Sequence, residues 1–217
     1  MKELAKILYG SQNCHLDIST SDRDYRIIVS PSFDDLYYSR TLNKEIDDHN
    51  SYMDVRTFTS SIIKGNPNAV ELLYSVDSTI NSTLFKDIVT LMKVKYGEGY
   101  LRYVWYYFTT AIIGMCVHSE KKGDTPKTRA RVEWYYNFVS ALIKNNYKLN
   151  DALFHDPSIW TNARAIREER EHEPGHNAED ITRLVNENGM PEKTDVGLFQ
   201  DDVVNLTKEL VKDCMEK

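Results

Sequence analysis

The chain has 217 residues, of which 41% are hydrophobic, enough for a buried core in one large domain or in a small domain with a helical extension. Its formal charge of −6 excludes a uniformly cationic surface, so any contact with nucleic acid has to come from a local basic patch. Cys14, Cys116 and Cys214 are far apart and odd in number, which excludes a disulfide framework and fits a reducing cytosol.

Neither of the two apolar segments that could contact a membrane is typical of a membrane protein. The apolar run within residues 1–10 is too short for a signal peptide. The most apolar segment, residues 103–117, is shorter than a membrane span and suits a buried helix. We therefore expect a soluble, cytoplasmic protein that makes no membrane contact.

Strand-like patterns are concentrated in the N-terminal part of the chain. Gly10 stops the first apolar run, and Pro31 biases the residue before it towards extended geometry, so a second strand ends there. Ser32 is typical of a helix N-cap. In chain order we expect strands at 6–10 and 24–31, a short helix at 32–42, a polar connection at 43–50, and a strand from 51 that runs into a helix closed by Gly65.

From about residue 79 onward the apolar periodicity is helical. Pro67 occupies a first-turn position, and Thr125 followed by Pro126 is a strong helix start. We expect helices at 66–75, 82–97, 100–123, 125–146, 156–174 and 201–217. The sequence therefore predicts an α+β fold, in which a small mixed β-sheet head flanked by helices (1–78) is followed by a helical C-terminal region that packs on it (79–217).

Asp22 and Asp24 stand two residues apart where the second strand begins, shortly after Gly10 and Ser11. Side chains at such spacing on a strand point to the same face, where two carboxylates repel each other unless a cation is present. Mg²⁺ prefers carboxylate oxygens together with substrate phosphates, and a Gly-Ser turn offers backbone N–H groups and a hydroxyl to a triphosphate. The pattern indicates nucleotidyl transfer, although an Asp-x-Asp alone, in a chain with 33 acidic residues, is more typical of a solvated turn.

The order of these motifs resembles the nucleotidyltransferase superfamily that includes DNA polymerase beta, whose signature is Gly-Ser, a short spacer and Asp-x-Asp. Within it, the chain is similar to the predicted RNA-repair-associated nucleotidyltransferases of bacteria and phages over residues 5–75, and more loosely to about residue 170. The chain departs from this family at Cys14-His15, where relatives usually carry tyrosine and glycine. The matching elements are Gly10-Ser11, Ser21-Asp22-Arg23-Asp24, Asp54 in YMDVRTF, and KGNPNAVELL at 64–73.

The resemblance implies two Mg²⁺ (or Mn²⁺) ions held by Asp22, Asp24 and Asp54, with Asp54 completing the metal that activates the acceptor hydroxyl. The alternative for Asp54 is an ordinary helix N-cap before VRTFTSSII. Other acidic residues are weaker metal candidates because they lie in polar runs: Asp34, Asp35, Asp47 and Asp48.

The resemblance also implies a nucleotide site in which Gly10 and Ser11 hold the β- and γ-phosphates and Ser21 lies nearby. Lys127 and Arg131, four residues apart at a helix start within the basic segment 121–131, could grip phosphates of the nucleotide or of RNA. The alternative, a solubilising helix start, is equally favoured by the residues themselves. A lysine at a comparable helix start in relatives favours a functional Lys127.

For three further features the sequence favours a structural role over a functional one. Asn66 and Glu71 fit a turn and a helix start better than a substrate contact. His172 and His176 have metal-like spacing, but the Pro-Gly pair between them favours a loop. The aromatic-rich residues 100–108 could stack on bases, yet their helical period is typical of core.

The expected function is metal-dependent transfer of a nucleoside monophosphate from an NTP, ATP among them, to a hydroxyl acceptor. RNA or tRNA, a protein side chain and a small molecule all remain open as acceptors, as does the oligomeric state. The alternative is a catalytically silent nucleotide-binding or protein-interaction module of the antitoxin type.

Overall fold

The computed structural model describes residues 1–169, 175–191 and 197–216. Contacts divide the chain into two compact units. The first, here called the sheet unit, comprises Met1–Asn13, Asp22–Lys95 and Val196–Lys217; the second, the helical unit, comprises Cys14–Ser21 and Tyr96–Asp195. The predicted α+β class is confirmed. Within the described residues, no helix is long and apolar enough to cross a membrane.

The sheet unit is built on five strands in the order β3-β4-β2-β1-β5. Pairing is antiparallel everywhere except between β2 and β4, which run parallel. The chain between these two strands crosses over and contains a short helix and an edge strand. The strands are β1 (Glu3–Tyr9), β2 (Asp24–Val29), β3 (Asn43–Glu45), β4 (Asn50–Asp54) and β5 (Ser78–Ile80).

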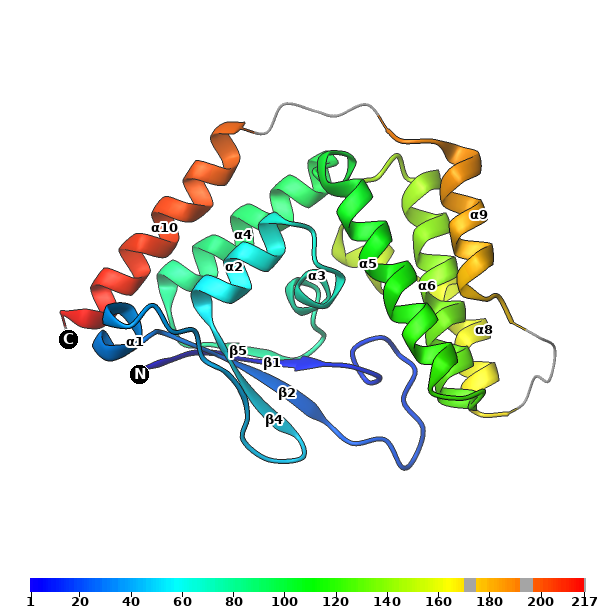
Figure 1. Cartoon of the computed structure of the whole chain (residues 1–217), viewed down its shortest axis with the longest axis horizontal. Coiled ribbons are helices and arrows are strands. Elements are labelled where there is room, and N and C mark those ends of the chain that lie inside the picture. Colours follow the sequence, from blue (N-terminus) through cyan, green and yellow to red (C-terminus); the bar gives the residue numbers. More distant parts are fainter. Residues whose placement is uncertain (170–174, 192–196, 217) are drawn as a thin grey trace. The chain divides into compact units, whose positions relative to one another are not determined.

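Helices cover one face of this sheet (Figure 1). Apolar residues of the two central strands, among them Ile7 of β1 and Ile28 of β2, are buried, and Phe58 of α2 packs on Phe85 of α4 with ring centroids 5.2 Å apart. Helix α10 packs against α2 within the same unit. The helices of this unit are α1 (Phe33–Tyr37), α2 (Val55–Ile63), α3 (Pro67–Leu73), α4 (Thr83–Glu98, which runs past the unit boundary) and α10 (Gly197–Met215).

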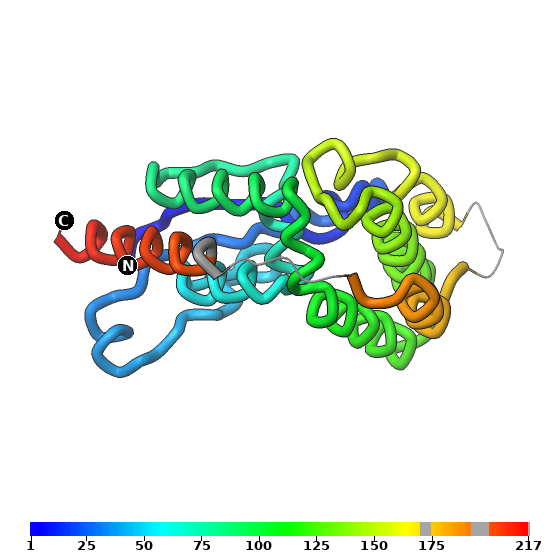
Figure 2. The backbone as a smooth tube through the Cα atoms, turned by 90° about the horizontal axis from the view of Figure 1, so that it is seen from above, coloured from blue at the N-terminus to red at the C-terminus, as the bar shows by residue number. Residues whose placement is uncertain are grey.

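The helical unit packs α6 against α5, α8 and α9 (Figures 1 and 2). Thr125 caps α6 through a capping box and Pro126 occupies its first turn, as the sequence predicts. Trp105, Phe108 and Phe138 belong to its buried core. Its helices are α5 (Leu101–Lys121), α6 (Pro126–Lys144), α7 (Asp151–Phe154), α8 (Pro157–Arg167) and α9 (Ala178–Asn188).

Some elements differ from the sequence-based expectation. The helix expected at 32–42 is confined to Phe33–Tyr37, although Ser32 caps it as predicted. The connection expected at 43–50 contains an edge strand, and β5 carries too few apolar residues to be recognised. Of the helix expected at 156–174, the described part ends at Arg167, and residues 170–174, with His172, lie outside the described residues.

The domain boundary also differs from the predicted division into 1–78 and 79–217. Most of α4 and all of α10 belong with the sheet, whereas residues 14–21 belong with the helices. The predicted division assigned each unit a continuous stretch of the chain. The contacts instead join segments that are far apart in the sequence.

A buried acid joins three elements of the helical unit. The side chain of Glu133, on α6, is 2% exposed, and its Oε2 accepts hydrogen bonds from the His176 backbone N–H at 3.0 Å and from the His176 ring Nδ1 at 2.7 Å. Its Oε1 accepts from Asn162 Nδ2, on α8, at 2.9 Å. Burial alone would raise the pKa of Glu133, but the hydrogen bonds from His176 and Asn162 outweigh it and hold that pKa below its usual range.

This network predicts a loss of stability in acid. A carboxyl whose pKa is lowered in the folded state stabilises that state fully above its unfolded pKa, about 4.3, and the stabilisation is lost as pH falls through the folded value. We expect urea unfolding, followed by tryptophan fluorescence, to show a steeper loss of stability below about pH 4 in the natural chain than in Glu133→Gln. All three tryptophans, Trp105, Trp134 and Trp160, lie in the helical unit and report on it selectively. Equal acid sensitivity of both chains would contradict this role.

Candidate functional site

The Gly-Ser turn lies at the end of β1, directly beside the start of β2. Tyr9 pairs with Asp24, so the turn and the second aspartate are neighbours in the sheet. Gly10 has φ of +82°, a left-handed conformation that favours glycine. A Cβ added at Gly10 would lie 3.5 Å from Asp24 Oδ2, which is ordinary contact, so the requirement for glycine here is conformational.

Glu71 of α3 holds this turn in place. Its carboxylate Oε1 accepts the Gly10 backbone N–H at 2.6 Å, although Glu71 is only 5% exposed. Asn13 adds a second connection, since its Nδ2 donates to the Glu71 carbonyl at 3.1 Å and its Oδ1 accepts the Val76 N–H at 3.0 Å. The structural interpretation of Glu71 made from the sequence agrees with this position, but the sequence did not reveal the partner of Glu71. The available signal was an acid among the apolar residues Ala69, Val70, Leu72 and Leu73.

The Gly10 amide therefore already has an acceptor. The resemblance assigned this amide to a nucleotide phosphate, whereas the structure gives it to Glu71. Of the predicted phosphate-binding pair Gly10 and Ser11, only Ser11 keeps its predicted role unchanged, and Ser11 is partly exposed.

Asp22 and Asp24 lie next to this turn. Asp22 is exposed, and Asp24 is partly buried with its Oδ1 3.7 Å from His49 Nδ1. The intervening Arg23 points elsewhere, because its Nη2 lies 2.5 Å from Asp77 Oδ2. Arg23 therefore pairs with Asp77 and does not neutralise Asp22 or Asp24. The structure brings Gly10, Asp22 and Asp24 to one end of the sheet.

Asp54 does not join them, and its predicted role as the third metal ligand is wrong. Because β2 and β4 are parallel, with Tyr25 opposite Asn50 and Val29 opposite Asp54, Asp54 lies at the opposite end of the strand pair from Asp24. Five residues of strand separate the two levels, roughly 16 Å at 3.3 Å per residue.

Asp54 has a structural role instead. It is the N-cap of α2, accepting the Arg56 N–H at 2.8 Å, and its fully buried carboxylate pairs with Arg56 Nη2 at 2.6 Å. The hydrogen bond with Asp54 raises the pKa of Arg56. The alternative interpretation of Asp54 as a helix cap is therefore the one that the structure supports.

The remaining donors still suit Mg²⁺. This ion commonly takes one or two protein carboxylates and fills its octahedral shell with water and substrate phosphates. Asp22 and Asp24 supply such a pair of hard oxygen donors. In the part of the chain that the structure describes, no three His, Cys, Asp or Glu side chains form a group that could hold a metal ion. The donor set therefore fits a metal shared with a nucleotide and does not fit the predicted three-carboxylate clamp.

The spacer between the two halves of the signature belongs to the helical unit. His15 has φ of +57°, its Nε2 lies 3.0 Å from His155 Nδ1, and its ring packs on Trp160. Burial and the neighbouring His155 lower the pKa of His15, which favours the neutral form of the His15 ring. Ser21 closes a turn in which its N–H donates to the Ile18 carbonyl at 2.8 Å and its Oγ accepts the Ile18 N–H at 2.9 Å. The predicted nucleotide role of Ser21 stays a prediction.

Lys127 and Arg131 lie on the first turns of α6, also in the helical unit. Lys127 is exposed. The Arg131 guanidinium donates to Cys14 Sγ at 3.4 Å and to the Tyr135 hydroxyl at 3.1 Å, and it lies over the Tyr135 ring. Arg131 therefore contributes to packing within the helical unit, and phosphate binding by Lys127 and Arg131 stays a prediction.

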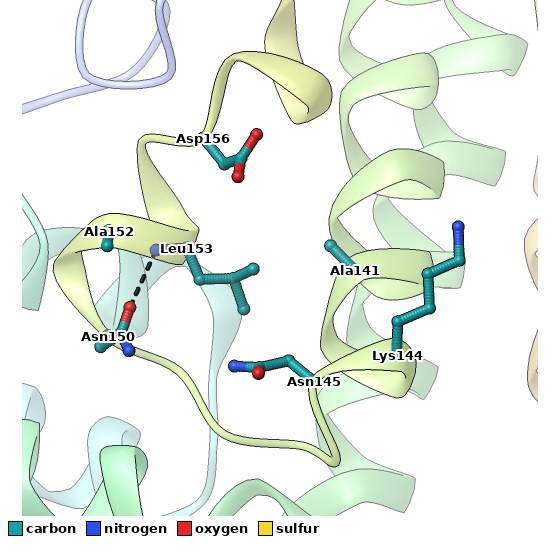
Figure 3. A pocket seen from close by; sticks show the side chains of 7 residues that line it. All are labelled: Ala141, Lys144, Asn145, Asn150, Ala152, Leu153 and Asp156. Carbon is teal, nitrogen blue, oxygen red and sulfur yellow. Dashed lines mark hydrogen bonds between the residues drawn. The ribbon is translucent and has the colours of Figure 1, made fainter.

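A hollow of about 440 Å³ in the helical unit is a weaker candidate site (Figure 3). The polar side chains that line it already have structural tasks, since Asn150 caps α7 through the Leu153 N–H and Asp156 caps α8. Lys144 extends away from both in Figure 3. Its polar groups do not converge on a common point, so the hollow offers no constellation for chemistry.

No protein-family model, curated protein or solved structure matches this chain.

From the position of Asp54 we expect its substitution to lower the stability of the protein without changing its affinity for metal. Asp54→Ala removes the α2 cap and leaves Arg56 without its partner, and we expect it to lower the free energy of unfolding by about 1–3 kcal/mol. Asp54→Asn, which can still cap, should cost less. Neither should change Mn²⁺ affinity measured by electron paramagnetic resonance with nucleotide present, whereas Asp24→Asn should weaken it. Equal loss of Mn²⁺ affinity in Asp54→Asn and Asp24→Asn would restore Asp54 as a ligand.

Glu71 provides a second test. Glu71→Ala leaves the partly buried Gly10 amide without its acceptor, and we expect a loss of about 1–3 kcal/mol in unfolding free energy. Glu71→Gln keeps an acceptor oxygen and should recover at least half of that loss. Amide hydrogen exchange at residues 10–13 should rise in Glu71→Ala alone. Unchanged exchange there would show that the turn does not depend on Glu71.

Proposed function

We propose that the chain is a metal-dependent nucleotidyltransferase whose metal is held by Asp22 and Asp24. The observation that carries this proposal is the meeting of the two halves of the signature: Tyr9 pairs with Asp24, and a Cβ placed on Gly10 would lie 3.5 Å from Asp24 Oδ2. Two oxygen donors beside a glycine turn suit a nucleoside triphosphate with its divalent cation. The sequence resemblance supports the same reaction class.

In this proposal the chain contributes position and charge more than covalent chemistry. Asp22 and Asp24 supply oxygen donors, Ser11 offers its hydroxyl to a phosphate, and Glu71 keeps the turn rigid by holding the Gly10 amide. Bound Mg²⁺ would neutralise charge that develops on the phosphate oxygens. Preorganised groups of this kind supply most of the rate in phosphoryl transfers.

The bond changes are those of an in-line displacement. The acceptor oxygen forms a bond to the α-phosphorus, the bond from that phosphorus to the oxygen bridging to the β-phosphate breaks, and pyrophosphate leaves with the electron pair. The acceptor must lose its hydroxyl proton. His49 lies beside the pair, with its Nδ1 3.7 Å from Asp24 Oδ1, and is the side chain that we propose to orient the acceptor there.

One observation favours the silent nucleotide-binding module as a second candidate. The position of Asp54 at the other end of the strand pair leaves the site with fewer carboxylates than the resembled enzymes require. A two-carboxylate site can bind a nucleotide with its metal and still be slow at transfer. Binding and transfer therefore have to be measured separately.

We expect incubation with α-labelled NTPs, Mg²⁺ and either total RNA or a small-molecule fraction to yield labelled product. Asp22→Asn and Asp24→Asn should each reduce transfer at least about a hundredfold, because each removes a charge that the transition state needs. Asp87→Asn, an exposed acid on α4, is the matched control and should be unaffected. NTP binding without transfer of label to any fraction would favour the silent nucleotide-binding module and contradict the proposed enzymatic activity.

A further inference from the structure

A polar cavity of about 420 Å³ lies in the sheet unit beside the aspartate pair. It is formed by the end of β1 and by the turn that joins β3 to β4. Its volume is in the range of small-molecule sites. The residues that line it are Tyr9, Glu45, Ile46, Asp47, Asp48, His49, Asn50 and Ser51.

The cavity borders the candidate active site through two residues. Tyr9 immediately precedes Gly10 and pairs with Asp24, and His49 lies 3.7 Å from Asp24 Oδ1. A molecule in this cavity would therefore place its atoms next to the carboxylate that the proposed reaction uses. This position suits the acceptor of the transfer.

Ser51 supplies independent evidence that the cavity is built for a ligand. Ser51 is 3% exposed, and its Oγ has no hydrogen-bond partner among the described residues. The strand register places Ser51 opposite Arg26 and on the same face as Tyr9 and Asp24, so its side chain points to the cavity side of the sheet. A buried hydroxyl without a partner costs free energy that a bound polar molecule would recover.

The charge of the lining selects the ligand class. The Asp47 carboxylate is used by the turn, where it accepts the His49 and Asn50 backbone N–H groups at 2.8 Å each. Glu45 and Asp48 are exposed and have no ion pair among the described residues. No Lys or Arg is among the lining residues, and the guanidinium of Arg26 lies over the ring of the lining residue Tyr9, 4.9 Å from its centroid. The lining therefore attracts cations and repels polyanions.

We propose that this cavity binds the acceptor, and that the acceptor is a small polyamine alcohol, such as an amino sugar, in place of a nucleic acid. The proposal rests on the function proposed above and names its acceptor class. Ammonium groups would pair with Glu45 and Asp48, and a hydroxyl would donate to or accept from Ser51. A further hydroxyl would reach the space between His49 and Asp24, where it can attack the α-phosphorus.

Binding can be tested without nucleotide or metal, so a failure here is distinct from a failure of nucleotidyl transfer. Spermidine, titrated into the full chain and followed by calorimetry and amide chemical shifts, should bind saturably and shift residues 45–51. Glu45→Gln/Asp48→Asn should weaken binding about five- to tenfold, since each exposed pair is worth up to about 1 kcal/mol. The control Asp34→Asn/Asp87→Asn, which removes the same charge from exposed acids elsewhere, should leave binding unchanged.

Ser51→Ala separates a ligand contact from a structural role. Because the hydroxyl has no partner in the free protein, the substitution should not lower the melting temperature, yet it should weaken binding of 1,3-diamino-2-propanol, which carries a hydroxyl, more than that of spermidine, which does not. If Glu45→Gln/Asp48→Asn and Asp34→Asn/Asp87→Asn weaken spermidine binding equally, the attraction depends on the net charge of the protein alone. That result would overturn the site. Non-saturable spermidine binding, or tRNA displacing spermidine from residues 45–51, would overturn it as well.

Discussion

The parallel pairing of β2 with β4 decides which carboxylates of this chain can act together. In a parallel pair, residues at equal distance from the strand starts lie side by side, so an acid that opens one strand cannot meet an acid that closes the other. Asp24 opens β2 and Asp54 closes β4. The acid at the strand end is thereby free to start helix α2, and the acid at the strand start meets the glycine turn. Had the two strands been antiparallel, the same residues would have converged.

Glu71 shows how a buried charge can serve a site without touching a substrate. An ionised carboxylate in an apolar helix is costly unless it is hydrogen-bonded, and here a backbone amide of the turn meets that need. The arrangement also fixes a glycine in a left-handed conformation that a free loop would not keep. Rigid support of this kind is what proposed electrostatic catalysis requires, because groups that must reorganise during the reaction lose their advantage.

Local features of the fold could be read from the sequence, and long-range ones could not. Ser32, Thr125 and Pro67 mark their helices because a cap or a first-turn proline acts within a few residues. Asp24 and Gly10 could be joined because a hairpin-like return makes neighbours of strands close in the chain. The level of Asp54 depends on a crossover whose register no local pattern encodes. The partner of Glu71 and the orphan hydroxyl of Ser51 are likewise products of packing between distant segments.

The segment 14–21 is assigned to the helices although the sheet precedes and follows it, and α10 returns to the sheet after the helices are complete. The polypeptide consequently changes unit four times, once inside the continuous helix α4. Neither unit corresponds to a contiguous stretch of gene, and a single crossover at any point within it would divide the sheet unit, which holds both chain ends. Exchange of either complete unit with a homologous gene would therefore need more than one crossover.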